Sequence, residues 1–485
     1  MPTPQLTKKL HEQTHCFEVE DSSRIKVSAD LLIRGGASSV RDPNPHAARL
    51  GRQFIKQNKG LLADFDVEAS LSYDGQNVGI WLKAGTYIGA LPLMSPTSGR
   101  PDYGLVIRPR FNWSGLGPML ATMGWKILPT PLRLPPIPGT ERKVPSWVLS
   151  SVVLFRLKQL LDKMERRFEL VENVLNAPRG HINWSTYLTQ KMPQAKFLQV
   201  PCQFPDLRDD RDLKSAIHYT LNKQLYGLQS QRHTGIAAIQ LIELCQALLA
   251  KVNNVPPRIP MPKTIESWLH GSLKTEVFSK GIQAIEWTVD DRGLAGISDL
   301  QGLPWIMPME IFFEAWVESI AESLVRRIGG QLRVGRKRET IYPITWNPPY
   351  VGSQRSLIPD FIIEKEKTTI ILDAKYKSHW EELSVSRWSR LGKQLRERHR
   401  EDLMQILAYS NLSDKPHIIS CLIYPCRTKT WQSLMSRNRI SHRASVRSGS
   451  KQIELILTAI PMDANKHEVV RIVADEIYSP RLEAN

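Results

Sequence analysis

The chain has 485 residues, with 65 lysines and arginines against 48 aspartates and glutamates, which gives a formal net charge of +17 at pH 7. Its length supports two to four domains at roughly 100–200 residues each, and its hydrophobic fraction of 41% is enough for packed cores, which excludes a disordered or collagen-like chain. The positive charge favours a polyanionic partner.

Membrane and secretory signals are missing from the sequence. No apolar run approaches the roughly 18 residues that a membrane-spanning helix needs, and the first 25 residues are polar, unlike a signal peptide. We therefore expect a cytoplasmic protein. The five cysteines lack the spacing of a structural zinc site or a disulfide framework, so we expect reduced, mostly buried thiols.

The first three segments of the chain differ in composition. Residues 1–126 alternate short apolar runs with turn residues and show little helical periodicity, which predicts a β-rich N-terminal domain. Six prolines between residues 129 and 145 predict a linker over 127–145. Residues 146–304 are predicted to be a mainly helical connector, because apolar residues from Trp147 to Phe168 keep near-helical spacing and further helical stretches follow at 212–226 and 235–252.

The last segment, residues 305–485, alternates helix and strand signals. A helix over 309–328 carries Ile311, Phe312, Trp316, Ile320 and Leu324 on one side and ends at Gly329-Gly330. Strands are predicted at 331–334, 341–346, 357–363 and 369–372, then a helix at 391–411 and a strand at 418–424. The two apolar runs around the charged turn 364–367 form a hairpin, and three of these four strands are expected in a core of order α-β-β-β-α-β. The fold class is therefore multidomain α+β.

The hairpin places charged residues together. Asp360 lies beside the first strand, and Asp373 and Lys375 end the second on the same strand face, because side chains alternate every two residues. Carboxylate oxygens suit Mg²⁺, and a lysine can orient or help deprotonate an attacking water, as phosphodiester hydrolysis requires. The alternative is that both aspartates are strand-end charges paired with nearby lysines.

Three further residues are candidates for this site. Gln405 and Tyr409 lie four apart on one helix face and could support the site, although a surface glutamine and a core-edge tyrosine would show the same spacing. Glu314 stands in an otherwise apolar helical turn, where its carboxylate must be paired, metal-bound or turned to solvent. With Glu318 and Glu322 it could also form a solvent-facing acidic stripe.

Three motifs together resemble the PD-(D/E)xK nuclease superfamily: Ile-Pro-Asp-Phe at 358–361, Ile-Leu-Asp-Ala-Lys-Tyr-Lys at 371–377, and Asp-Leu-Met-Gln-Ile-Leu-Ala-Tyr at 402–409. The Gln-x-x-x-Tyr element resembles its RecB-like branch and, within it, the McrC family, the nuclease subunits of McrBC-type modification-dependent restriction systems. Looser similarity runs from about residue 80 to 425.

The resemblance implies a restriction-endonuclease-like C-terminal domain that cuts DNA in prokaryotic restriction or anti-phage defence. It implies Asp360, Asp373 and Glu314 as metal ligands for Mg²⁺, with Mn²⁺ as a substitute, Lys375 as the catalytic lysine, and Gln405 and Tyr409 as the supporting pair. It also implies an McrB-like AAA+ GTPase or ATPase partner that binds the N-terminal domain. The sequence itself contains no G-x-x-x-x-G-K-[ST] motif for binding nucleotide.

Two basic tracts fit a DNA ligand. Residues 427–451 contain seven lysines and arginines and no acid, among them Arg437, Arg439, Arg443 and Arg447, and a second tract covers 387–400. The first is predicted to be a mobile arm that orders on DNA, with a solvated surface loop as the alternative. Trp388 and Trp431 could stack on bases or simply pack. A different class of function is also open, a non-catalytic DNA-binding adaptor that regulates an NTPase.

Overall fold

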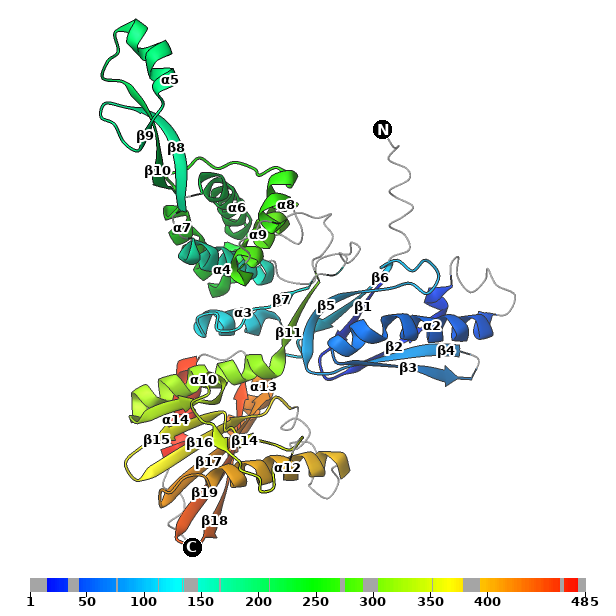
Figure 1. Cartoon of the computed structure of the whole chain (residues 1–485). Coiled ribbons are helices and arrows are strands. Elements are labelled where there is room, and N and C mark those ends of the chain that lie inside the picture. The colour runs from blue at the N-terminus through cyan, green and yellow to red at the C-terminus, as the bar shows by residue number, and fades with distance from the viewer. Residues whose placement is uncertain are drawn as a thin grey trace. The chain divides into compact units, whose positions relative to one another are not determined.

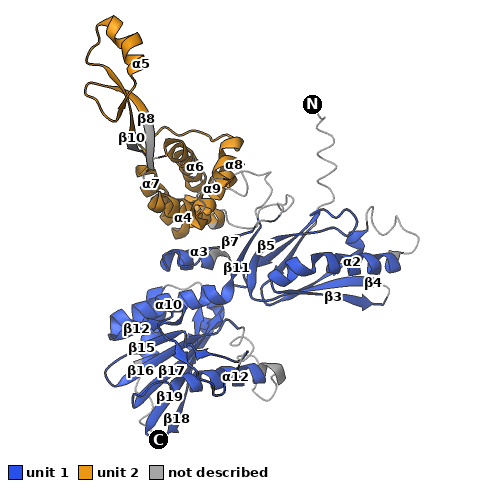
Figure 2. Ribbon diagram, in the orientation of Figure 1, with its two compact units in different colours: residues 1–144, 301–485 blue, residues 145–300 orange. Residues whose placement is uncertain are grey.

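A computed structural model gives the fold and divides the chain into two compact units, one of residues 1–144 with 301–485 and one of residues 145–300 (Figure 2). The structure describes residues 15–33, 43–75, 77–111, 113–132, 134, 147–164, 167–208, 210–270, 275–290, 304–350, 352–377, 393–462 and 466–478. Within these ranges no helix combines the length and the apolar character needed to cross a membrane.

The amino-terminal part of the first unit is built on two sheets (Figure 1). The amino-terminal sheet has, in spatial order, β1 (His15–Glu20), β6 (Tyr103–Arg108), β5 (Tyr87–Leu93), β11 (Trp305–Pro308) and β7 (Thr130–Pro131). A three-stranded antiparallel sheet follows the order β2 (Arg24–Ser28), β4 (Asn77–Ala84) and β3 (Val67–Asp74). Since β11 pairs with both β5 and β7, residues on either side of the second unit share one sheet.

The prediction of little helix in residues 1–126 is wrong. Helix α2 (Pro43–Asp64) crosses this part, accompanied by η1 (Ala29–Leu32) and α3 (Trp113–Thr122). The apolar stripe of α2 is interrupted by Asn58, which is buried and whose side-chain amide bonds the backbone N–H and C=O of Met94. A polar residue that is satisfied inside the core conceals the helical periodicity from the sequence.

Only part of the predicted proline-rich linker is described. Thr130 and Pro131 form β7 at the edge of the amino-terminal sheet, the position at which a proline costs no ladder hydrogen bond. Residue 133 and residues 135–145 lie outside the described residues.

The second unit combines a helical bundle with a small sheet. Its helices are α4 (Trp147–Lys163), α6 (Arg211–Gln229), η5 (Arg232–Thr234), α7 (Ile236–Ala250), α8 (Pro262–His270) and α9 (Glu276–Val289), which confirms the helices predicted after residue 211. The antiparallel sheet has the order β8 (Arg167–Leu175), β10 (Val200–Arg208) and β9 (His181–Ile182). Short helical turns, α5 (Trp184–Thr186), η3 (Tyr187–Lys191) and η4 (Met192–Gln194), connect β9 to β10. The helix predicted to include Phe168 ends earlier, at Lys163, and Phe168 belongs to β8.

The carboxy-terminal part of the first unit is a six-stranded mixed sheet. Its order is β12 (Gln331–Val334), β15 (Phe361–Glu364), β16 (Thr368–Ala374), β17 (His417–Cys426), β19 (Lys451–Pro461) and β18 (Ser441–Ser448). Strands β16, β17 and β19 are parallel neighbours, and the other pairs are antiparallel. Helices α10 (Met309–Ile328) and α12 (Lys393–Ser410) lie on the two sides of this sheet (Figure 1). The chain order α10, β12, β15, β16, α12, β17 agrees with the predicted α-β-β-β-α-β core.

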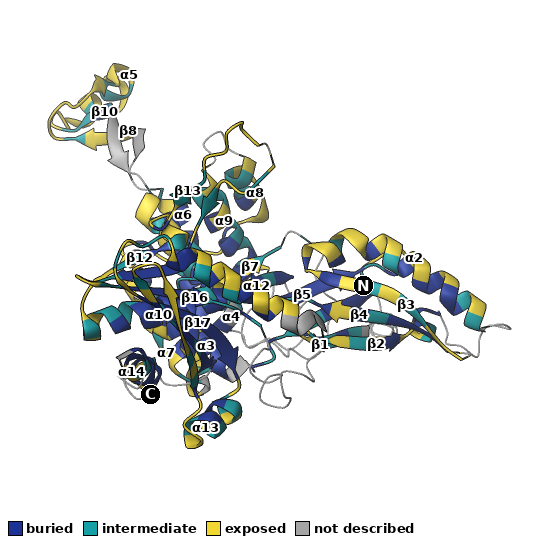
Figure 3. Cartoon of the chain, turned by 90° about the horizontal axis from the view of Figure 1, so that it is seen from below, coloured by how far each residue is buried: buried dark blue, intermediate teal, exposed yellow. Residues whose placement is uncertain are grey.

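The burial of residues along β16 agrees with its central position in the sheet. In α10, burial differs from the prediction at one residue, Ile311. Ile370, Ile371 and Leu372 are all buried, as expected for a strand covered on both faces, and the dark blue of β16 and β17 in Figure 3 marks their buried residues. Helix α10 ends at Gly329, whose φ of 76° suits glycine, as predicted. Ile311 is 42% exposed and does not belong to the apolar side of the helix.

One further prediction for this part holds only partly, and another is wrong. The segments predicted as strands at 341–346 and 357–358 do contain short strands, β13 (Tyr342–Pro343) and β14 (Ser356–Leu357), but these pair with each other in a separate two-stranded sheet that follows the 3-10 turn η6 (Gly335–Lys337) in the chain. The tract 427–451 is not a mobile arm, because it forms α13 (Thr428–Ser436) and β18, which pairs with β19 and precedes α14 (Lys466–Tyr478). Trp431 is buried and therefore packs, whereas Trp388 lies outside the described residues.

The cysteines confirm the expectation of reduced thiols. All five are free, and all but Cys16 are buried.

Candidate active site

Two carboxylates face each other across strands β15 and β16. The antiparallel register pairs Phe361 with Leu372, and its continuation by one residue sets Asp360 opposite Asp373. The backbone N–H of Ala374 donates a 2.8 Å hydrogen bond to Oδ2 of Asp360, which fixes this carboxylate at the open end of the hairpin. The hairpin therefore brings together the two predicted carboxylates.

The ammonium of Lys375 lies beside this pair. Its Nζ is 2.7 Å from Oδ2 of Asp373, whose side chain is 1% exposed. The backbone N–H of Lys375 donates to the carbonyl of Ile423, so the pairing with β17 continues one residue past β16. Lys375 is therefore fixed by two interactions, the hydrogen bond of its backbone N–H with Ile423 and the ion pair of its ammonium with Asp373.

The electrostatics of the cluster are dominated by buried negative charge. Burial raises the pKa of Asp360 well above its usual range, and the charges of Asp373 and Glu314 raise this pKa further. Burial also raises the pKa of Asp373, against the opposing charge of Lys375. The pKa of Lys375 is raised although burial opposes this, because Asp373 and Asp360 face its ammonium. An additional cation would relieve the repulsion among these carboxylates.

The acidic residues of α10 have separate surroundings. Glu318 is buried, and its carboxylate lies 2.9 Å from Nζ of Lys126 and 2.5 Å from Nη2 of Arg336, while Lys126 also contacts Glu322 at 2.7 Å. Glu314 is half-buried and forms no ion pair with any residue that the structure describes. Burial raises its pKa, which Asp373 raises too. Glu314 thus lies close enough to the two aspartates, and to Glu318, for their charges to act on one another.

Gln405 and Tyr409 are joined to each other and lie near the cluster. Nε2 of Gln405 donates a 2.8 Å hydrogen bond to the Tyr409 hydroxyl, and Tyr409 is buried while Gln405 is exposed. Burial raises the pKa of Tyr409, and the charges of Asp373 and Asp360 add to this rise. The four-residue spacing thus brings the two side chains together on one helix face, and Tyr409 lies within electrostatic reach of the aspartates.

Asp402 is a buried carboxylate near the site to which the sequence assigns no role. It accepts hydrogen bonds from Nζ of Lys377 at 2.7 Å and from the Tyr424 hydroxyl at 3.1 Å. The negative charge of Asp402 raises the pKa of both Asp373 and Lys375. A signal was present in the sequence, because Asp402 lies one turn before Gln405 and shares its helix face.

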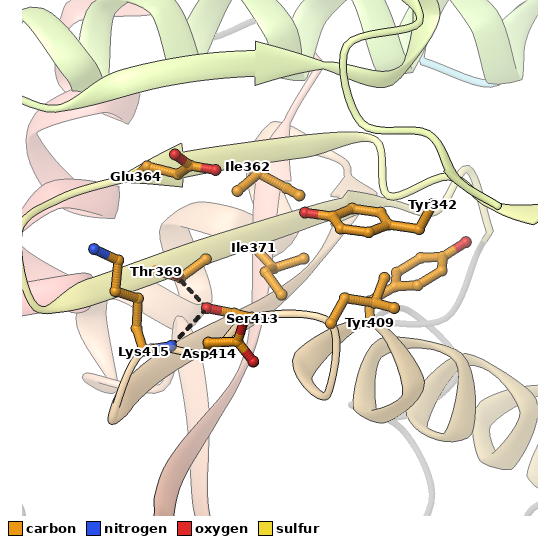
Figure 4. A pocket seen from close by; sticks show the side chains of 10 residues that line it. Tyr342, Ile362, Glu364, Thr369, Ile371, Tyr409, Ser413, Asp414 and Lys415 are labelled. Atoms are coloured by element: carbon orange, nitrogen blue, oxygen red, sulfur yellow. Dashed lines mark hydrogen bonds between the residues drawn. The ribbon is translucent and has the colours of Figure 1, made fainter.

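A cavity of about 220 Å³ lies on the same side of the sheet as Tyr409 (Figure 4). Tyr342 and Tyr409 stand at one end of the cavity, and Glu364 and Lys415 at the other. Its lining does not include Asp360, Asp373 or Lys375. The carboxylate–lysine cluster is therefore separate from this cavity and shares only Tyr409 with it.

The predicted DNA-binding arginines lie on and around β18. Arg437, Arg439 and Arg447 are exposed. Arg443 is engaged with acids instead, since its Nη1 lies 2.5 Å from Oε1 of Glu454 and its Nη2 lies 3.9 Å from Glu476. Three of the four arginines thus present their charge to solvent.

The residues present can be tested against a divalent cation. The described ranges hold no group of three His, Cys, Asp or Glu side chains gathered to bind a metal by themselves. Mg²⁺, however, is commonly bound by one or two carboxylates, with waters and substrate oxygens completing its shell. Both oxygens of Asp373 are buried without a well-aligned hydrogen bond from the described residues, and Asp360 lies opposite. The pair fits such an ion.

The fold and the cluster define a class, a mixed α/β chain with paired carboxylates and a lysine at the end of a central strand. The chain belongs to the family described as "McrBC 5-methylcytosine restriction system component", whose model matches residues 141–425, more than half of the sequence. No curated protein matches the chain.

Two solved structures from Thermococcus gammatolerans are similar to the chain. One is a refined half-complex from a tetradecameric assembly of McrB AAA+ hexamers with bound McrC, with 15% identity and a TM-score of 0.42 over 95% of this chain and 100% of that chain. The other is a cryo-EM structure of the McrBC complex, with 15% identity and a TM-score of 0.27 over 64% of this chain and 88% of that chain.

Proposed function

We propose that the chain is the Mg²⁺-dependent DNA endonuclease subunit of a prokaryotic restriction system that defends against phage. The observation that carries this proposal is the placement of Asp360 opposite Asp373 with the Lys375 ammonium 2.7 Å from the latter. Membership of a restriction-system family supports it. The proposed nuclease domain comprises residues 305–485 and has a restriction-endonuclease-like fold, with the N-terminal domain at 1–126 and the connector at 146–304.

The residues have distinct proposed roles. Asp360 and Asp373 would hold the ion, with Glu314 as a third carboxylate nearby and Mn²⁺ as a substitute metal. When bound, the ion supplies the positive charge that polarises the phosphoryl oxygen and stabilises the developing negative charge. Lys375, whose ammonium is held by Asp373, would orient the attacking water and stabilise the negative charge that develops as this water loses its proton to solvent. Gln405 and Tyr409 support the site through their mutual hydrogen bond.

DNA is the proposed substrate because the chain is strongly basic. Its net charge is +17, and Arg437, Arg439 and Arg447 present exposed guanidinium groups on the domain that carries the site. Arginines of this kind bind phosphates irrespective of sequence and release condensed counterions.

Replacing Arg437, Arg439 and Arg447 together by glutamine is expected to weaken DNA binding equally on all sequences. The slope of log affinity against log salt should become shallower by up to about 0.9 for each phosphate that an arginine no longer neutralises. Binding titrations over a salt series, on modified and unmodified duplexes, measure this slope. An unchanged slope would exclude binding of these arginines to phosphates, and selective loss of discrimination between the duplexes would indicate base reading.

Arg443→Gln is the matched control. Because the Arg443 side chain is 13% exposed and pairs with Glu454, we expect it to hold the hairpin of β18 and β19 in place. Its loss should lower the melting temperature and leave the salt slope at the parental value.

The proposed partner is an AAA+ NTPase, because the sequence lacks a phosphate-binding loop of its own and the family is one of system components. The test of the whole proposal is scission of duplex DNA when chain, partner and nucleotide are combined with Mg²⁺, and its loss with EDTA. DNA that stays intact under every metal condition while partner and DNA still bind would instead identify a non-catalytic adaptor.

A further inference from the structure

The residue that follows Lys375 is tied to the amino-terminal part of the first unit. The Tyr376 hydroxyl donates a 2.8 Å hydrogen bond to Oδ2 of Asp21, which lies in the turn directly after β1. Oδ1 of Asp21 accepts a 2.7 Å hydrogen bond from the backbone N–H of Arg110. Asp21 is 1% exposed and Tyr376 is 5% exposed, so the contact is closed to water.

The ring of Tyr376 is enclosed as well. The guanidinium of Arg110 lies 4.4 Å from the ring centroid, and its Nε is 3.5 Å from Oδ2 of Asp21. The rings of Phe111 and Phe313 are each 6.1 Å from that of Tyr376. Phe313 belongs to α10 and directly precedes Glu314. The tyrosine therefore joins three elements: the turn after β1, the segment after β6, and α10.

A second contact links the same parts of the chain. Lys126 donates to Glu318 at 2.9 Å and to Glu322 at 2.7 Å, both on the helix that carries Glu314. Lys126 thus contacts the helix α10, and Asp21 contacts Tyr376 just after the end of β16. Both residues precede the second unit in the chain.

Tyr376 occupies a position where the backbone needs support. Strand β16 ends at Ala374, and beyond it the Lys375 N–H still bonds Ile423 while the Lys377 ammonium bonds Asp402. Tyr376 stands between these two lysines. Anchoring its side chain fixes the short segment that sets the direction of the Lys375 side chain.

We propose that Tyr376 is a positioning residue, anchored by Asp21 and Arg110, through which the amino-terminal sheet holds the Lys375 ammonium in its working place. The proposal rests on the nuclease function proposed for Asp360, Asp373 and Lys375. It assigns to the amino-terminal part a role inside the site, in addition to any docking of a partner. Burial and the charge of Asp21 raise the pKa of Tyr376 well above its usual range, so the hydroxyl remains a donor.

The test compares two tyrosine-to-phenylalanine variants in the full chain. Tyr376→Phe removes only the hydroxyl and leaves the ring in place. Tyr103→Phe is the matched control, because Tyr103 is also buried and donates to a backbone carbonyl, that of Leu31, away from Lys375. Tyr376→Phe is expected to lower kcat for DNA cleavage about 10–100-fold with KM unchanged, the size of effect typical of residues that orient a metal or catalytic ligand. Tyr103→Phe should keep the parental kcat.

A second readout does not depend on cleavage. Hydrogen exchange measured by mass spectrometry should show faster deuterium uptake in a peptide covering 374–377 for Tyr376→Phe, because the Lys375 N–H loses its support. The control should show parental uptake in that peptide. Exchange that rises across β1, β5 and β6 as well would indicate general loosening of the sheet and would overturn a positioning role.

A double variant decides whether Asp21 acts through Tyr376. If the two residues act through one contact, Asp21→Asn combined with Tyr376→Phe should lower kcat no more than the stronger single variant. If the decreases in kcat of the two single variants multiply in the double variant, Asp21 does not act through Tyr376. If Tyr376→Phe keeps the parental kcat and the parental deuterium uptake, the proposal is wrong. If the parent chain cuts no DNA even with the partner NTPase, nucleotide and Mg²⁺, the proposed function fails, while the uptake at 374–377 still decides whether the hydroxyl holds this segment.

Discussion

Asp373→Asn and Lys375→Ala are each expected to lower the rate of DNA cleavage at least about a hundredfold, since changes one shell further out already cost 10–100-fold in metal sites. The asparagine removes the charge that would hold the ion, and the alanine removes the ammonium 2.7 Å from that carboxylate. Neither change deletes an apolar core side chain, so the melting temperature and the affinity for DNA should stay near parental values. Plasmid cleavage with the partner NTPase and Mg²⁺ measures the rate.

The opposite end of the same hairpin supplies the controls. Glu366 and Lys367 are exposed in the turn between β15 and β16, so Glu366→Gln and Lys367→Ala repeat the two chemical changes far from the cluster. Both should cut DNA at the parental rate. An Asp373→Asn chain that cuts DNA or protects cells like the parent would show that the site is assigned to the wrong residues.

The purified chain alone is expected to cut duplex DNA poorly and to gain activity strongly when a separately encoded AAA+ NTPase and its nucleotide are added. The reason is that the sequence contains no phosphate-binding loop with which to drive movement along DNA. Cleavage measured with chain, partner and nucleotide omitted in turn tests this expectation. The Asp373→Asn chain is the control, because it should bind the partner and leave nucleotide hydrolysis intact while DNA stays whole. Full activity of the single chain without nucleotide would contradict the expectation.

The docking site of this partner needs a test other than truncation. Removing residues 1–125 would take away β5, the strand that pairs with β11, together with Asp21 and Arg110, which contact Tyr376. The candidate site would then lose support for reasons unrelated to the partner. Hydrogen-exchange protection in the complex avoids this problem. We expect protection within residues 15–126, and protection confined to residues 145–300 would contradict docking by the N-terminal domain.

The candidate site could be predicted largely because its signals are local. Asp360 and Asp373 flank a hairpin whose charged turn and apolar strands fix the register, and alternation sets Lys375 beside Asp373. Gln405 and Tyr409 follow helical spacing in the same way. Whether Glu314 faces solvent or the aspartates could not be decided from the sequence, because the answer depends on how α10 packs against β12 and β16.

The parts that could not be predicted depend on long-range contacts. Strand β11 joins a sheet whose other members lie before the second unit, and no local pattern marks that pairing. The burial of Asn58 in α2 is stabilised by the backbone of Met94, which is distant in sequence. The tract around Arg443 has the composition of a loop, yet its pairing with Glu454 and the register with β19 make it a strand. The contact of Asp21 with Tyr376 is of the same kind.

The central claim is that Asp360 and Asp373 form the metal site of a nuclease, and a crystal soaked in Mn²⁺ tests it most directly. Anomalous scattering locates the ion without reference to activity, and Asp373→Asn crystals treated identically serve as the control. We expect an anomalous peak between the two carboxylates in the parent chain and none in the variant. No peak at this position in the parent, or a peak that persists unchanged in Asp373→Asn, would contradict the claim.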